Sequence, residues 1–121
     1  MMENNAKALK NTKMELKFPA LFYMGLKELI HAKSNDLLEL RRMELKFIKS
    51  KHDLAMKERT ILLTTDFKEL GLTNEKMRNS YVNEKLGDDK AKMDILKHEI
   101  ASKKDTIEII NDLIQLEMNG E

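Results

Sequence analysis

The fold is decided by residues 86–114, LGDDKAKMDILKHEIASKKDTIEIINDLI. From its first leucine onward, positions at alternating spacings of three and four residues are mostly apolar. They are Leu86, Asp89, Met93, Leu96, Ile100, Lys103, Ile107, Ile110 and Ile114. This spacing is typical of a coiled-coil seam, which is buried only against another helix. The stretch therefore predicts a long helix with a helical partner, and Gly87 marks its weakest point.

The first half of the chain supplies a second long helix, expected at about residues 19–60. Pro19 suits the first turn of a helix, because the N–H that proline lacks is not needed there. No other proline follows. Ser34 or Asn35 could cap a new helix, but we expect one bent helix through this point.

Two apolar stripes run along this helix, and the sequence favours one of them for burial. The favoured stripe keeps spacings of seven and three residues and consists of Leu38, Leu45, Ile48, Ala55 and Leu62. The second stripe consists of Leu40, Phe47 and Leu54, and we expect it to stay exposed in a monomer. An exposed apolar stripe of this kind predicts a dimer or a docked partner.

A short structured connector, residues 61–74, is predicted between the helices. Thr65 or Asp66 can cap a single turn that Gly71 ends in a left-handed conformation. Thr73 or Asn74 then caps the second helix, expected at about residues 75–118.

Charge is distributed unevenly between the two halves. Residues 1–60 carry 13 basic and 8 acidic side chains, whereas residues 61–121 carry 9 basic and 13 acidic ones. Opposite charge on the halves favours antiparallel pairing. We therefore predict an all-α fold, an antiparallel coiled-coil-like hairpin over residues 18–121, preceded by a basic flexible arm at residues 1–17.

Composition excludes several classes of protein. The chain has no cysteine, so disulfide frameworks and thiolate metal sites are excluded. No apolar stretch approaches the roughly 18 residues of a membrane span, and no secretory signal is visible, so we expect a cytoplasmic protein.

Catalytic, cofactor and metal sites are not predicted. The glycines never cluster into a phosphate-binding loop, and no serine lies in a glycine-flanked turn. Glu28 and His31 have the spacing of a di-iron ligand pair, but the second pair that such a site needs is missing. Asp94 and His98, four residues apart, could ligate one metal ion, but an acid and a histidine at this spacing arise readily by chance. We expect a protein that is not an enzyme.

Candidate partner-binding residues are mainly aromatic. Phe22 and Tyr23 fall at one expected end of the hairpin, and Phe67 and Tyr81 at the other. They either plug the ends of the core or anchor a protein partner. Leu40 and Phe47 of the second stripe complete the candidate partner surface.

Nucleic-acid binding is the alternative. The segment 41–59, RRMELKFIKSKHDLAMKER, holds seven basic and three acidic residues. Candidate phosphate-binding residues within it are Arg41, Arg42, Lys46, Lys49 and Lys51. The interspersed acids and the single aromatic favour a solvated helical face instead.

The connector and the start of the second helix resemble a known sequence pattern. Residues 65–82, TDFKELGLTNEKMRNSYV, between two long charged helices, resemble a pattern in small helical proteins of phages and prophages of low-GC bacteria. The resemblance implies an accessory protein that acts by binding in the host cytoplasm, such as an anti-CRISPR-like inhibitor of host defence or a modulator of DNA processing. It implies no catalytic residues.

We therefore expect a non-enzymatic helical protein that binds a protein partner and forms a dimer. Nucleic-acid binding through the basic residues of the first helix is one alternative. A structural spacer or assembly factor is the other.

Overall fold

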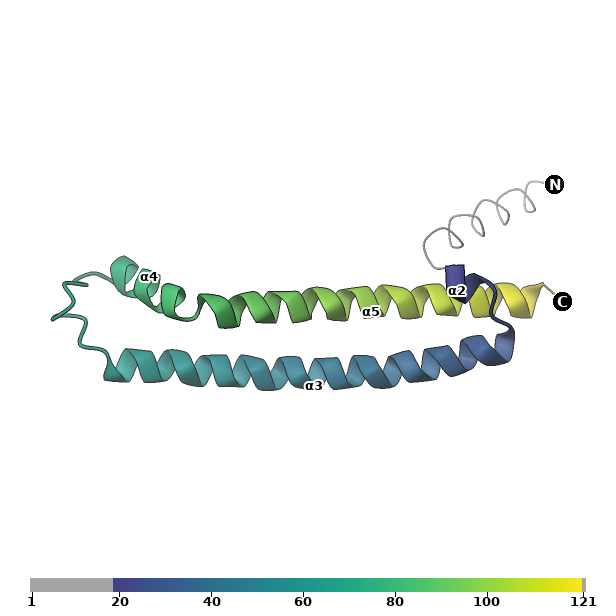
Figure 1. Cartoon of the computed structure of the whole chain (residues 1–121), viewed down its shortest axis with the longest axis horizontal. Coiled ribbons are helices and arrows are strands. Elements are labelled where there is room, and N and C mark those ends of the chain that lie inside the picture. Colours follow the sequence, from purple (N-terminus) through teal and green to yellow (C-terminus); the bar gives the residue numbers. More distant parts are fainter. Residues whose placement is uncertain (1–18, 121) are drawn as a thin grey trace. The chain divides into compact units, whose positions relative to one another are not determined.

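The computed structural model describes residues 19–120, apart from the side chains of Pro19 and Phe22. Every regular element in that range is helical: α2 (Pro19–Phe22), α3 (Leu26–Thr64), α4 (Glu75–Lys85) and α5 (Gly87–Asn119) (Figure 1). The predicted all-α class is confirmed. None of these helices is both long and apolar enough to span a membrane. The predicted basic arm, residues 1–17, lies outside the described residues.

The first long helix begins later than predicted. Pro19 does open a helical turn, but that turn is the separate four-residue α2, and α3 starts at Leu26. Between them the Met24 N–H donates to Leu21 O at 3.2 Å, and the Leu29 N–H donates to Gly25 O at 2.9 Å. The turn places Leu21 and Met24 against a buried cluster, and this tertiary packing is why the helix does not run on from Pro19.

α3 is continuous through the step at residues 34–36, as expected. Ser34 does not start a new helix, because its hydroxyl donates to Ile30 O at 3.1 Å within α3. Near the other end, Thr60 and Thr64 donate in the same way to Met56 O and Thr60 O. α3 therefore ends at Thr64, four residues beyond the predicted end.

The connector has the predicted turn chemistry. Asp66 Oδ1 accepts from the Glu69 N–H at 3.1 Å, so Asp66 caps the single turn. The Leu72 N–H donates to Phe67 O at 2.9 Å, and Gly71, at φ 74°, donates to Lys68 O at 3.1 Å. These two bonds form a Schellman motif, which requires the left-handed residue that glycine provides.

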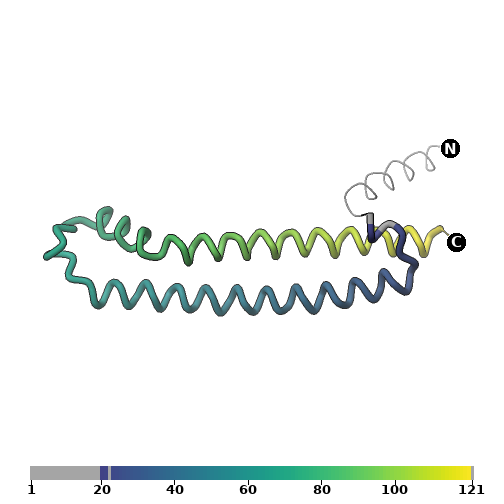
Figure 2. The backbone as a smooth tube through the Cα atoms, in the orientation of Figure 1, coloured from purple at the N-terminus to yellow at the C-terminus, as the bar shows by residue number. Residues whose placement is uncertain are grey.

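The second long helix is divided at Leu86, next to the weak point predicted at Gly87. α4 begins at Glu75 and is capped by Asn74, whose side chain accepts from the Met77 N–H at 2.8 Å, as predicted. Leu86 then departs from helical geometry with φ −101° and ψ 5°. Its N–H still donates to Val82 O, so the break is a bend rather than a loop (Figure 2).

The chain divides into two compact units, which are described separately. Within the described range, unit 1 comprises residues 19–41 and 101–120, and unit 2 comprises residues 42–100. In unit 1, Leu29 and Ile110 are 1% and 0% exposed and pack with Leu113. Half-buried apolar residues surround this cluster: Leu21, Met24, Ala32, Ile109, Ile114 and Leu116. In unit 2 the buried side chains are Val82, Leu86 and Leu96.

Candidate interaction surfaces

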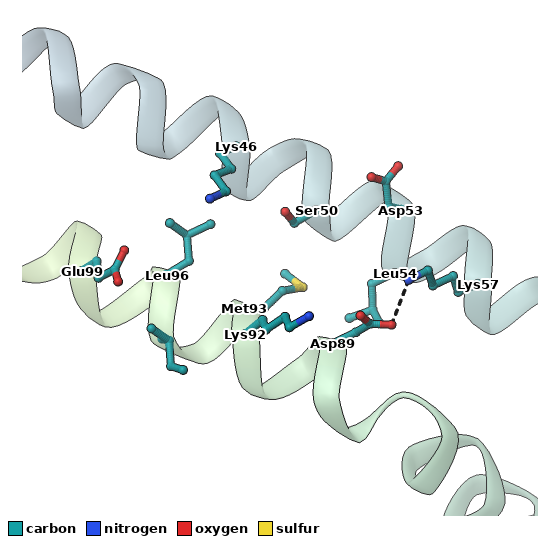
Figure 3. A pocket seen from close by; sticks show the side chains of 11 residues that line it. Lys46, Ser50, Asp53, Leu54, Lys57, Asp89, Lys92, Met93, Leu96 and Glu99 are labelled. Carbon is teal, nitrogen blue, oxygen red and sulfur yellow. Dashed lines mark hydrogen bonds and ion pairs between the residues drawn. The ribbon is translucent and has the colours of Figure 1, made fainter.

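In unit 2, a cleft separates the facing sides of α3 and α5. It encloses about 390 Å³. Leu54 of α3 lines it opposite Met93 and Leu96 of α5 (Figure 3). Its rim is charged and polar, with Lys46, Ser50, Asp53, Lys57, Asp89, Lys92 and Glu99 around it. The cleft therefore has a narrow apolar floor and charges of both signs.

One ion pair crosses the cleft. Lys57 Nζ lies 3.0 Å from Asp89 Oδ2, and both side chains keep substantial contact with solvent. Asp89 is one of the two polar positions in the predicted seam. Among residues 19–120 no group of three or more histidine or acidic side chains is arranged to hold a metal ion.

The other polar seam position, Lys103, is paired within unit 1. Lys103 Nζ lies 3.2 Å from Glu39 Oε2 and 3.5 Å from Asp36 Oδ1. Burial by itself would lower the pKa of Lys103. The hydrogen bond to Glu39 and the negative charges of Asp36 and Glu39 outweigh that effect and raise its pKa above the ordinary value.

Every position of the predicted seam of α5 is buried or half-buried, as the spacing predicted. The stripes of α3, in contrast, are the reverse of the prediction. Leu38, Leu45, Ile48, Ala55 and Leu62 are all exposed, and Leu40, Phe47 and Leu54 are half-buried. The prediction that the first stripe is buried and the second exposed is therefore wrong.

The reversal has two physical reasons. The half-buried stripe of α3 is the more apolar one, because Met43 and Ile61 extend the series of Leu40, Phe47 and Leu54, and the polar seam positions of α5 add a preference for matching charges. Lys103 needs an acid opposite it and Asp89 needs a base. The inner stripe of α3 supplies Asp36 in unit 1 and Lys57 in unit 2. The other stripe has His52 and Arg59 between its apolar residues and offers no acid for Lys103. Matching opposite charges between the two predicted helices was the signal that could have identified the inner face from sequence.

We call the exposed stripe of α3 within unit 2 the outer face. Its apolar members are Leu45, Ile48, Ala55 and Leu62, and three of them have large exposed fractions: 55% for Leu45, 63% for Ile48 and 48% for Leu62. His52 and Arg59 lie between them and are exposed. The outer face is therefore a regular series of uncovered apolar side chains in unit 2, interrupted by two basic residue types.

The predicted partner-binding residues lie in different surroundings. Leu40 and Phe47 belong to the half-buried inner side of α3. Tyr23 is 74% exposed in unit 1, and the side chain of Phe22 lies outside the described residues.

Phe67 and Tyr81 contact each other in unit 2. Their rings meet edge to face, with centroids 5.9 Å apart and planes at 88°. Arg78 lies over the Phe67 ring, at 5.9 Å from its centroid, and donates to Leu72 O at 3.2 Å. Lys85 lies over the Tyr81 ring at 5.5 Å. These contacts tie the connector to α4.

The five candidate phosphate-binding residues are all exposed, but those of unit 2 point in several directions. In a helix successive residues are rotated by about 100°. Lys46 lines the cleft, whereas Lys49 and Lys51 flank the outer face on opposite sides. Arg42 shares the flank of Lys49, and Arg41 is an exposed residue of unit 1. A single basic stripe is not formed by these residues.

Comparison with protein-family models, with curated proteins and with solved structures finds no match to this chain.

Proposed function

We propose that this chain is a non-enzymatic binding protein that recognises a protein partner through the outer face of α3. One observation carries the proposal: a heptad-spaced apolar stripe of α3 faces solvent although its spacing is that of a helix-packing seam. Exposed apolar series of this kind are typical of interaction sites. The resemblance of residues 65–82 to small phage accessory proteins supports the same class of function.

The proposal includes a fold in which α3 and α5 pair along their whole length as an antiparallel hairpin. Contacts inside each unit support it. In unit 1, Leu29 packs with Ile110 and Leu113, whereas Asp36 pairs with the earlier residue Lys103. In unit 2, the cleft brings residues early in its α3 segment near those late in its α5 segment, and Lys57 pairs with Asp89.

A helical partner suits the outer face best. A stripe with spacings of three and four residues presents knobs and holes that another helix can fill. Exposed basic side chains on its borders, such as Lys49 and Lys51, would add orientation more than affinity, because exposed ion pairs contribute little.

Capture of partners from a nuclease-treated lysate of a low-GC bacterial host tests the proposal. The tagged full chain is compared with Ile48→Asp on the outer face and with Ile95→Asp as a matched control. Ile95 is 59% exposed but belongs to α5, where it lines the cleft and not the outer face. We expect a protein that is retained by the native chain and by Ile95→Asp and is lost with Ile48→Asp.

Equal retention by all three chains would contradict the outer face as the binding site. Retention that disappears with nuclease treatment would favour the nucleic-acid alternative instead. In that case binding should weaken steeply with salt and respond to charge reversal at Arg42 and Lys49.

A further inference from the structure

We infer that the outer face is the contact surface of a homodimer in which α3 of one copy packs antiparallel on α3 of a second copy. The inference rests on the proposed function, because it assigns an occupant to the same face. It uses only residues of unit 2. Its argument comes from the pattern of charges along the two borders of the outer face.

The outer face has the geometry of a complete seam. Leu45, Ile48, His52, Ala55, Arg59 and Leu62 follow one another at spacings that alternate between three and four. Two residue series border this seam at intervals of seven. One border consists of Glu44, Lys51 and Glu58, and the other of Arg42, Lys49, Met56 and Leu63. Lys51 and Glu58 form no ion pair with any other residue of the range 19–120 and are exposed.

In one antiparallel register, neither border brings like charges of the two copies together. This register places Leu45 of one copy opposite Leu62 of the other, Ile48 opposite Arg59, and His52 opposite Ala55. Because an antiparallel pair brings each border next to the same border of its partner, Lys51 then lies opposite Glu58. Twofold symmetry produces this ion pair twice.

The second border adds no repulsion in this register. Arg42 lies opposite Leu63 of the other copy, and Lys49 lies opposite Met56. The long stems of arginine and lysine can cover these apolar side chains while their charged ends stay in water. Leu63 is the most exposed large apolar residue of α3, at 79%, and would gain cover.

The other arrangements bring like charges together. A shift by one heptad toward the N-terminus places Lys49 opposite Lys49 and Lys51 opposite Lys51. A parallel pair places Arg59 opposite Arg59 at the seam. Like charges at these positions are destabilising, so the charge pattern of this chain selects the antiparallel register with Leu45 opposite Leu62.

Charge reversal tests the register by sedimentation equilibrium of the full chain. Lys51→Glu or Glu58→Lys alone turns two attractions into two repulsions, so each should weaken the dimer about tenfold. The double variant Lys51→Glu/Glu58→Lys should restore the dissociation constant to within about threefold of the native value. Lys97→Glu, the same charge change on α5, should leave it unchanged. Circular dichroism checks that each variant keeps its helices.

Engineered thiols give an independent test, because the chain has no cysteine of its own. Leu45→Cys and Leu62→Cys chains are mixed and equilibrated with oxidised and reduced glutathione. The antiparallel register predicts the mixed disulfide between the two variants as the main product. Predominance of disulfides between identical chains would contradict it and favour a parallel pair.

The outcomes separate this inference from the proposed function. A monomer at all concentrations, or a double charge reversal that fails to restore the dimer, overturns the homodimer. If a different protein is then captured through Ile48, the proposed function stands with another occupant. If nothing is captured through the outer face either, both fail.

Discussion

Unit 1 and unit 2 each contain a segment of α3 and a segment of α5, but they differ in what packs over the facing sides of these helices. In unit 1, the segment before α3 adds Leu21 and Met24 to the packing of Leu29 and Ile110, and the cluster is closed. In unit 2, the facing sides of α3 and α5 enclose a cleft with a charged rim. A helix pair alone buries a narrow stripe, so a closed core here depends on the short extra segment.

The comparison predicts different costs for core truncations. Ile110→Ala in the closed cluster should destabilise unit 1 by about 2–5 kcal/mol, because a fully buried side chain is removed and the cavity collapses only partly. Leu54→Ala in the cleft should cost about 1 kcal/mol, since its side chain is already in contact with water.

Native-state hydrogen exchange measures both variants, because it reports opening free energies separately for each unit. Ile30→Ala serves as the matched control, because its side chain is 49% exposed in unit 1, and it should change little. Equal loss of protection in both units for Ile110→Ala would show that the two units open together and would remove the basis of the comparison.

The connector gives unit 2 a rigid end that does not depend on a large core. Gly71→Ala should destabilise it by about 1–2 kcal/mol, because an L side chain is strained at φ 74°. Gly87→Ala is the matched control, since a Cβ there meets open space at the start of α5. It should be neutral or stabilise by up to about 1 kcal/mol. Urea unfolding followed by circular dichroism measures both, and equal effects would contradict the role of the left-handed turn.

The Asn74 cap at the start of α4 also stabilises this end of unit 2 through a local contact, and its loss should have a smaller effect on stability. Asn74→Ala removes the acceptor of the Met77 N–H and should cost about 1 kcal/mol. Asn74→Asp should retain most of the stability, because aspartate is an equally good cap. Faster amide exchange in the first turn of α4 would identify the site of the effect. Unchanged exchange in the alanine variant would show that the cap contributes nothing.

The two polar seam positions give the smallest difference between the units. Lys57→Met breaks an exposed pair and should cost less than about 0.5 kcal/mol. Lys103→Met should cost somewhat more, up to about 1 kcal/mol, because Lys103 is less exposed and contacts two carboxylates. Urea unfolding at neutral pH distinguishes them, and a larger effect at Lys57 would contradict the difference in burial.

Lys103 also predicts a pH dependence. Its pKa is raised in the folded chain, so its contribution is fully present below the ordinary lysine pKa of about 10.4. The contribution is lost as pH rises through the raised folded value. The difference in stability between the native chain and Lys103→Met should therefore persist at neutral pH and shrink at the alkaline end of a titration. A difference that disappears near neutral pH would contradict this.

Local sequence signals predicted the features that depend on local physics. The seam of α5, the Asn74 cap and the left-handed Gly71 follow from spacing and backbone geometry within a few residues. The break next to Gly87 was also visible, although the bend falls at Leu86.

Features that depend on tertiary contacts were not predicted correctly. The start of α3 at Leu26 depends on the packing of Leu21 and Met24 against residues of α5, far away in the chain. The face that α3 turns inward depends on which residues lie opposite it. Heptad spacing is equally good on the outer face, so spacing alone selected the stripe that faces solvent. The sequence correctly indicated two apolar stripes on α3, but the prediction assigned the wrong stripe to the interior. The stripe that was predicted to be buried now supplies the outer face, which is the candidate site.

The connector has a consequence for how the chain folds. Its Asp66 cap, its Schellman bonds and the bond from Arg78 to Leu72 join residues no more than six positions apart. Contacts between near neighbours form on the microsecond scale and need little loop-closure entropy. Once this turn is made, the α3 and α5 segments of unit 2 are held within reach of each other, and the search for their mutual contacts is short. We therefore expect this part of the chain to fold at the speed of a low-contact-order protein, although its paired helices lie far apart in sequence.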